Sequence, residues 1–122
     1  MFQLLLVASG GAVGASLRFI LGNMLKFYFF HSFYATLCIN VIGSFFIGYL
    51  ISLGLVRSLS EDFVKYFLII GVLGSFTTFS AFSYEAIELF SSNKIFLFIL
   101  YVTLSIILCI AASFVGIYLN KN

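Results

Sequence analysis

The chain has 122 residues, of which 63% are hydrophobic, 20% are aromatic and only 8% are charged. About a quarter of the residues of a soluble domain are charged, so this composition excludes an ordinary soluble globule and indicates an integral membrane protein. The net charge of +2 is spread over the whole length and provides no basic patch for nucleic acid. Cys38 and Cys109 lie singly in apolar runs, which supports neither a disulfide framework nor a CxxC metal site.

Four apolar stretches are long enough to cross a bilayer, since a transmembrane helix needs about 20 residues. They predict a single four-helix transmembrane domain over residues 1–122, with spans at about 2–25, 33–56, 63–90 and 95–119. No charged leader or small-residue cleavage pattern marks the first stretch, so we expect it to be retained as a helix. The predicted fold class is therefore an all-α integral membrane protein.

The charges at the ends of these spans hardly favour one orientation in the membrane. With both termini on one side, Arg57, Lys65 and Lys121 fall on that side, whereas Lys26 and Lys94 fall on the other. Cytoplasmic loops normally carry a clear excess of Lys and Arg. The near tie leaves two interpretations open: an antiparallel dual-topology homodimer, or one orientation that wins by a residue or two.

Polar side chains recur at four-residue intervals in the second and fourth spans. In the second span Thr36, Asn40 and Ser44 share one helix face. A polar group in hydrocarbon must find a partner or line a cavity, and for Asn40 alone a bond to a neighbouring helix is the simpler interpretation. The fourth span carries a longer track of the same spacing, at Tyr101, Ser105, Cys109 and Ser113. This track indicates either a pore wall or hydroxyls bonded to the carbonyl four residues earlier.

The third span contains the sequence's most unusual stretch, at residues 71–82. Its two glycines and the adjacent Thr77 and Thr78 favour a local break in the helix. A break frees backbone carbonyls, which at membrane depth are tolerated only inside protein or beside water, where they can bind cations. Phe79 and Phe82 follow at a spacing of three, so their rings project from one face. The pattern predicts a third helix broken near its middle.

Three ionisable side chains in or beside the spans are candidates for a functional role. Arg18 follows small residues in the first span, and we expect a structural role, either reaching an interface or donating to freed carbonyls. Glu85 lies about two turns after the predicted break, where it either lines a vestibule or belongs to a solvated helix end. His31 lies in a loop without a partner for catalysis or metal binding, so an enzyme is the least supported class.

Three motifs together resemble the Fluc family of fluoride channels, also called CrcB, over essentially the whole chain. The motifs are Gly10 and Gly11 through Gly14 and Ala15 to Arg18, Asn40 and Val41 with Gly43 and Ser44, and Gly74 through Thr77, Thr78, Phe79 and Ser80 to Phe82. The fold implied by the resemblance is an antiparallel dual-topology homodimer with two pores and a structural sodium ion at its centre. Three positions depart from the family pattern: Phe19 replaces a common Tyr, Ala81 a common Thr, and Cys109 a common hydroxyl residue.

The resemblance also implies roles for individual residues. Together with the face shared by Thr36 and Asn40, it gives an expected fluoride pathway of Thr36, Asn40, Phe79, Ser80, Phe82, Tyr101, Ser105, Cys109 and Ser113. The backbone carbonyls of Gly74 and Thr77 match the family's sodium donors.

Neutral donors of this kind suit fluoride, because a pore must replace the water of a strongly hydrated ion and still release it. Amides, hydroxyls and the positively polarised edges of phenylalanine rings offer this compromise. Without a nucleotide-binding motif, transport is expected to be passive. A potential of 100 mV, negative inside, is worth about 2.3 kcal/mol per charge and lowers an internal monovalent anion roughly fiftyfold. The hypothesis is a fluoride-selective channel that exports fluoride across the bacterial plasma membrane and confers fluoride resistance.

Two other classes compete with the channel. A small dual-topology multidrug transporter of the four-helix type needs a titratable carboxylate in its substrate site. The first two spans contain no Asp or Glu, and Glu85 and Glu88 come late in the third. A structural or assembly subunit without transport of its own is the other alternative, and a liposome flux assay distinguishes it. The expected partners are fluoride, membrane lipid and a second copy of the chain.

Overall fold

The computed structural model describes residues 1–54 and 61–119. Every regular element in these ranges is a helix: α1 (Phe2–Phe29), α2 (Ser32–Ser52), η2 (Phe63–Leu73), α3 (Gly74–Phe76), α4 (Phe79–Ser91) and α5 (Ile95–Tyr118). The segment η2 is π-helical and runs directly into α3, which is separated from α4 by Thr77 and Thr78. Four stretches are long and apolar enough to cross a membrane, namely α1, α2, Phe63–Ser91 and α5. The predicted all-helical fold with four potential membrane spans is confirmed.

Two helix ends differ from the predicted spans. The helix α1 continues past residue 25 to Phe29. The helix α2 ends at Ser52, before the expected end at residue 56, because Gly54 adopts a left-handed conformation with φ 64°. Val56 of the predicted span lies outside the described residues, as do Arg57 and Lys121 of the charge comparison.

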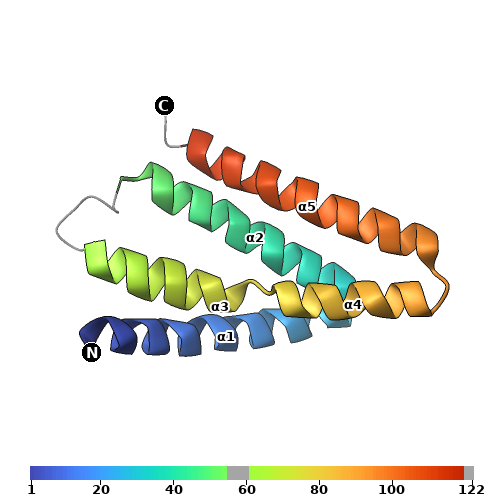
Figure 1. Cartoon of the computed structure of the whole chain (residues 1–122), viewed down its shortest axis with the longest axis horizontal. Helices are drawn as coiled ribbons and strands as arrows, with labels where there is room; N and C mark the ends of the chain where they lie inside the picture. The colour runs from blue at the N-terminus through green and yellow to red at the C-terminus, as the bar shows by residue number, and fades with distance from the viewer. Residues whose placement is uncertain (55–60, 120–122) are drawn as a thin grey trace.

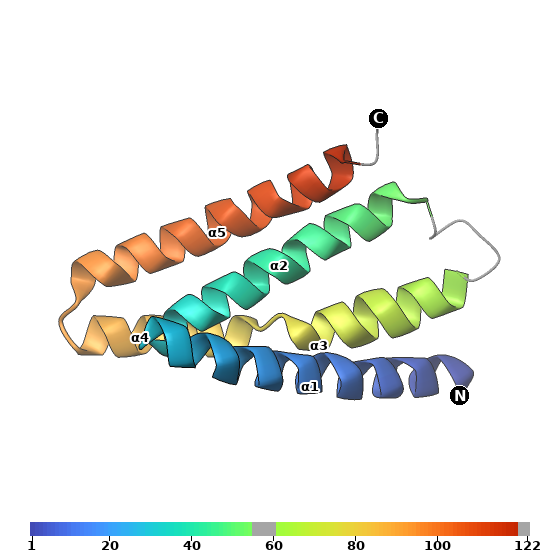
Figure 2. The same cartoon turned by 180° about the vertical axis from the view of Figure 1, so that it is seen from behind.

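The helices associate in two close pairs. The helix α1 packs on η2, and α2 packs on α5 (Figures 1 and 2). A Cβ atom at Gly10 or Gly14 would collide with backbone carbonyl oxygens of η2, and one at Gly48 or Gly116 would collide with backbone of the facing helix. Small residues therefore allow the two backbones of each pair to touch, which is how membrane helices commonly associate.

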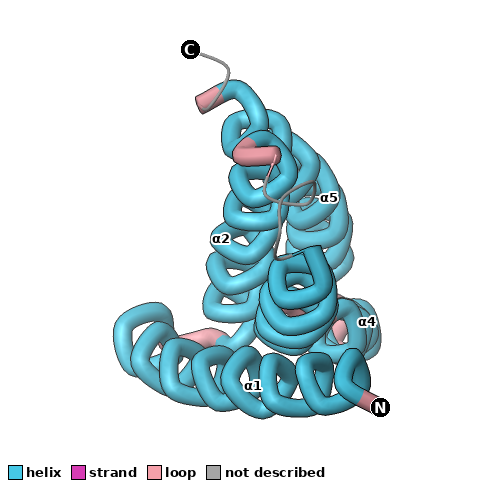
Figure 3. The backbone as a smooth tube through the Cα atoms, turned by 90° about the vertical axis from the view of Figure 1, so that its left-hand side faces the viewer, coloured by secondary structure: helices cyan, strands magenta, loops and turns pink. Residues whose placement is uncertain are grey.

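The two ends of the bundle differ in what they contain. The start of α1 and the end of α5 lie at one end, the terminus end, and the α1–α2 loop and α4–α5 turn form the other, the loop end (Figure 1). Seen along the bundle, α1 lies across one side while α2 and α5 stand next to each other (Figure 3). The main cluster of buried hydrophobic side chains lies in the half toward the loop end and consists of Phe82, Ala86, Leu89 and Tyr101.

Candidate functional site

The backbone between α3 and α4 is extended, with ψ 155° at Thr77 and φ −148° at Thr78. The Asn40 side chain of α2 bonds this segment twice. Its Nδ2 donates to the Thr78 carbonyl at 3.1 Å, and its Oδ1 accepts from the Thr78 N–H at 2.8 Å. The hydroxyl of Thr78 then accepts from the N–H of Ala81 at 3.1 Å and caps the start of α4. As the simpler interpretation of Asn40 predicted, its amide bonds a neighbouring span, and it does so where that span is interrupted.

These contacts give two backbone N–H groups different acceptors from those they would have in a continuous helix. An α-helix would pair the Thr78 N–H with the Gly74 carbonyl and the Ala81 N–H with the Thr77 carbonyl. Here the two N–H groups donate to Asn40 Oδ1 and Thr78 Oγ1 instead. The carbonyls of Gly74 and Thr77, which the family resemblance singled out, therefore lose their helical donors.

A cavity of about 290 Å³, the break cavity, lies beside the extended segment. It gathers residues from α2, the third span and α5, including Asn40, Ser44, Gly74, Thr77, Thr78, Phe79 and Cys109. Gly43 also lines it, and a Cβ atom at that position would collide with Thr77 Cγ2. The structure thus brings several members of the expected pathway together around one space.

Aromatic rings continue from the break toward the loop end. The ring centroids of Phe79 and Phe82 are 5.1 Å apart, and those of Phe82 and Tyr101 are 5.2 Å apart. Tyr101 is followed by Phe33 at 5.5 Å, and Phe33 by His31 at 5.4 Å. We call these five side chains the aromatic row. Phe82 is only 8% exposed, whereas Phe79 is 77% exposed in the single chain.

Glu85 joins two residues of the expected pathway and is only 7% exposed. Its Oε1 accepts from the Thr36 hydroxyl at 2.9 Å, and its Oε2 accepts from the Tyr101 hydroxyl at 2.8 Å. The interpretation as a solvated helix end is wrong, because α2 and α5 cover this face of α4. Sequence reasoning missed the carboxylate as a partner, although its spacing of three from Phe82 places both on one helix face.

The polar track of α5 divides into two parts. The Ser113 hydroxyl donates to the Cys109 carbonyl at 3.1 Å and to the Ser44 carbonyl at 2.9 Å. For this hydroxyl, the predicted bond to the carbonyl four residues earlier is confirmed. The Ser105 hydroxyl is buried and has no hydrogen-bond partner among the described residues. Buried polar atoms are nearly always paired, so this orphan donor indicates a place for water or an ion.

Ser80 of α4, which the expected pathway also includes, is exposed, and its hydroxyl lies 3.2 Å from that of Thr78.

Arg18 lies elsewhere, in a second cavity of about 420 Å³ between α1, α2 and α4, which we call the arginine cavity. Asn23 and Lys26 of α1 line it together with Arg18, and Thr36 and Glu85 line it from the opposite helices. Two cationic residues and the buried Glu85 therefore line the same space. The half-buried Arg18 is separate from the break cavity in the single chain.

Four helical stretches, an interrupted third span and a row of rings and hydroxyls between α2, α4 and α5 define a small multi-helix membrane protein. Residues 5–117 match the family described as "CrcB-like protein, Camphor Resistance (CrcB)". The chain therefore belongs to the CrcB family, and it is a multi-pass protein of the bacterial plasma membrane.

Several relatives resemble the chain over nearly its whole length. It is 42% identical to the fluoride-specific ion channel FluC of Campylobacter hominis over 122 residues, covering 98% of this chain and 96% of the relative. It is 39% identical to FluC of Agrobacterium fabrum, covering 100% of this chain and 98% of the relative. FluC of Idiomarina loihiensis is 40% identical, with 95% of this chain and 90% of the relative covered.

Proposed function

We propose that this chain is a fluoride-specific ion channel, through which fluoride leaves the cell down its electrochemical gradient, and that it thereby confers fluoride resistance. Relatives of 39–42% identity over essentially the whole chain carry this name. The structural observation that carries the proposal is the path from the interrupted backbone along Phe79, Phe82 and Tyr101 to a carboxylate held by two hydroxyls.

The path offers an anion neutral partners at successive positions. The Asn40 amide has a second N–H beyond the one bonded to Thr78, and ring edges carry positive charge density. The hydroxyls of Thr36 and Tyr101 already stabilise one anionic group, the Glu85 carboxylate. A fluoride ion takes these donors in place of the carboxylate. The orphan hydroxyl of Ser105, about one turn along α5 from Tyr101, is a further donor.

The single chain leaves part of this path open to its surroundings. Phe79 lines the break cavity and is largely exposed in the single chain. We infer that a second, antiparallel copy covers this side, so that the extended Thr77–Thr78 segment of the broken third helix lies inside the membrane at the dimer centre. Lipid then contacts only the outer faces of the helices.

The carbonyls of Gly74 and Thr77 fit a sodium ion at that centre. Unwound backbone carbonyls are known sodium ligands in membrane proteins, and the helical donors of these two are diverted. Each of the two antiparallel copies would contribute its Gly74 and Thr77 carbonyls. When bound, the cation supplies fixed positive charge beside the anion path. In this arrangement Arg18 has a structural role in the arginine cavity, away from the sodium site.

Fluoride efflux from liposomes that contain the purified protein tests the proposal, with a fluoride electrode as the readout. Phe82→Ile removes a ring from the path and is expected to slow efflux strongly. Leu89→Ile changes another buried residue of the same cluster on α4 and is the matched control, with efflux near that of the unmodified chain. Efflux no faster than from protein-free vesicles would instead support an assembly subunit without transport.

The multidrug transporter is not favoured. Such a transporter needs a titratable carboxylate in its substrate site, whereas the first two spans contain no Asp or Glu. The relatives are named as ion channels, which is not an enzyme class.

A further inference from the structure

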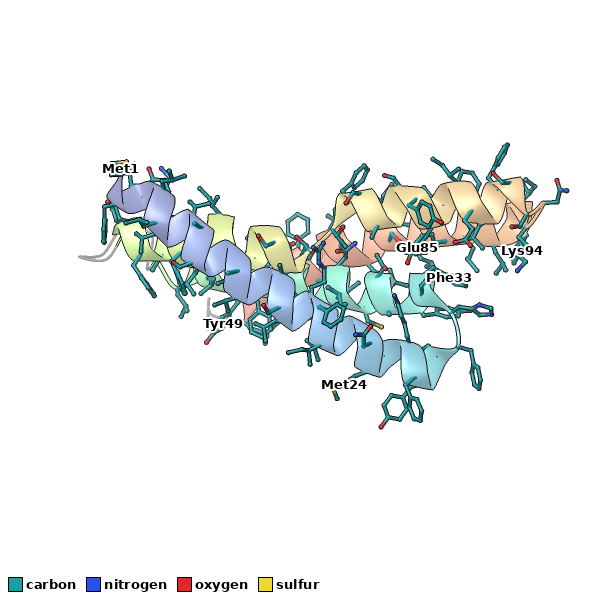
Figure 4. All side chains as sticks on the ribbon, turned by 90° about the horizontal axis from the view of Figure 1, so that it is seen from below. Met1, Met24, Phe33, Tyr49, Glu85 and Lys94 are labelled. Carbon is teal, nitrogen blue, oxygen red and sulfur yellow. The ribbon has the colours of Figure 1, made fainter. Side chains whose placement is uncertain are left out.

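A third cavity, the outer cavity, lies at the loop end and has a volume of about 270 Å³. The α1–α2 loop and the α4–α5 turn enclose it. Its lining includes four ionisable side chains, His31, Glu85, Glu88 and Lys94. Of these only Glu85 is buried, so the cavity opens to the surface (Figure 4 shows Glu85, Phe33 and Lys94 at the same end).

The outer cavity continues the path described above. The aromatic row ends there, because the His31 ring stacks on Phe33 at 5.4 Å with an interplanar angle of 17°. Phe33 in turn contacts Tyr101, the residue that holds Glu85. Glu85 lines both the outer cavity and the arginine cavity, so its carboxylate stands between them. An ion that passes Tyr101 toward the loop end enters the outer cavity.

The charged side chains around this space have both signs. Glu85 and Glu88 of α4 carry carboxylates, and Lys94 of the turn carries an ammonium group. Lys26 at the end of α1 lines the adjoining arginine cavity. Substitution of a single charged side chain therefore changes the net charge beside the path.

We propose that the outer cavity is an electrostatic vestibule of the anion path, whose charged side chains set the local concentration of a hydrated monovalent anion before it reaches Tyr101. Lys94 raises this concentration, and Glu85 and Glu88 lower it. Charged clefts change local ion concentrations in this way, to an extent that falls with ionic strength. This inference rests on the proposed fluoride channel and adds residues that set its rate.

The charge effect is tested by fluoride flux through full-length protein in liposomes at low and high concentrations of an impermeant salt. At low salt, Glu88→Gln is expected to raise the flux about twofold and Lys94→Gln to lower it about twofold, the size expected for one charge several ångströms from the ion in water-like surroundings. Both effects should vanish near 1 M salt, where the screening length is about 3 Å. Glu88→Asp and Lys94→Arg keep the charge and are the matched controls, with unchanged flux.

Two results would overturn the vestibule. One is a change of the same sign in Glu88→Gln and Lys94→Gln, or no change in either variant. The other is a difference that persists at high salt. Both require that the unmodified chain conducts fluoride. If the unmodified chain does not conduct, the proposed function itself fails, so the two failures are distinguishable.

Discussion

The two halves of the bundle are built in different ways. Toward the terminus end, helix backbones touch directly, α1 against η2 through Gly10 and Gly14, and α2 against α5 through Gly48 and Gly116. Lipid provides no hydrophobic force that drives helices together, so this close packing is the main source of association there.

Toward the loop end, side chains rather than backbones separate the helices. An amide bonds the backbone of Thr78, a carboxylate bonds Thr36 and Tyr101, and the arginine and outer cavities lie between the elements. Tight glycine contacts in one half thus fix the helices well enough for the other half to hold spaced donors and cavities. Substitutions in the two halves should therefore separate stability from conduction.

The largest effect is expected for Asn40→Asp, at the boundary of the two halves. The carboxylate cannot donate to the Thr78 carbonyl, and it places a negative charge in the anion path. We expect fluoride flux to fall about a hundredfold or more, since an unpaired buried charge costs about 3–5 kcal/mol. Liposome flux measures the change. Cys38→Ser, a polar substitution on the same helix, is the control, and near-normal flux in Asn40→Asp would contradict the assignment.

A substitution in the glycine-packed half should act on stability first. Gly14→Ala places a Cβ atom against the Val72 carbonyl, and we expect a loss of about 1–3 kcal/mol in the free energy of unfolding. Gly22→Ala on the same helix meets only the Ile39 side chain, at 3.7 Å, and should be neutral or slightly stabilising. Denaturant titration in mixed micelles compares the two. Equal stability of both variants would show that the backbones are not in close contact.

Tyr101→Phe keeps the aromatic row and removes one hydrogen bond in the polar half. One oxygen of the buried Glu85 loses its donor, so stability should fall by about 1–3 kcal/mol. Fluoride flux should fall about threefold to tenfold, because the path also loses a donor. Tyr84→Phe on the exposed face of α4 is the matched control for both measurements. A flux equal to that of the control would remove the Tyr101 hydroxyl from the path.

Much of this architecture could be predicted from the sequence because hydrophobic length and glycine placement act locally. Four apolar stretches predicted the four long helical segments, and the small residues of the first span coincide with its backbone contacts. The π-helical form of η2 could not be predicted, because nothing in the sequence of Phe63–Leu73 distinguishes a π-helix from an ordinary α-helix. The end of α2 at Ser52 depends on the left-handed conformation of Gly54, whose effect the hydrophobic pattern hides.

For the site, the spacing of residues was informative but their partners were not. The four-residue rows in the second and fourth spans predicted which faces carry polar groups. The sequence could not show that Thr36 and Tyr101 meet at Glu85, because that depends on how α2, α4 and α5 cross. Nor could it show which hydroxyl of the α5 track bonds a carbonyl, as Ser113 does, and which is left without a partner, as Ser105 is.

The difference between these two serines gives the smallest and most specific prediction. Ser105→Ala removes a buried donor that has no partner among the described residues, so stability should be unchanged or higher by about 1 kcal/mol. Flux should nevertheless fall about twofold to fivefold, because an ion passing Tyr101 loses a free donor. Ser16→Ala, whose hydroxyl bonds the Ala12 carbonyl on the exposed face of α1, should change neither quantity appreciably. A variant that is less stable and conducts normally would mean that the hydroxyl serves packing alone, whereas higher stability with slower flux identifies a polar group kept for the ion rather than for the fold.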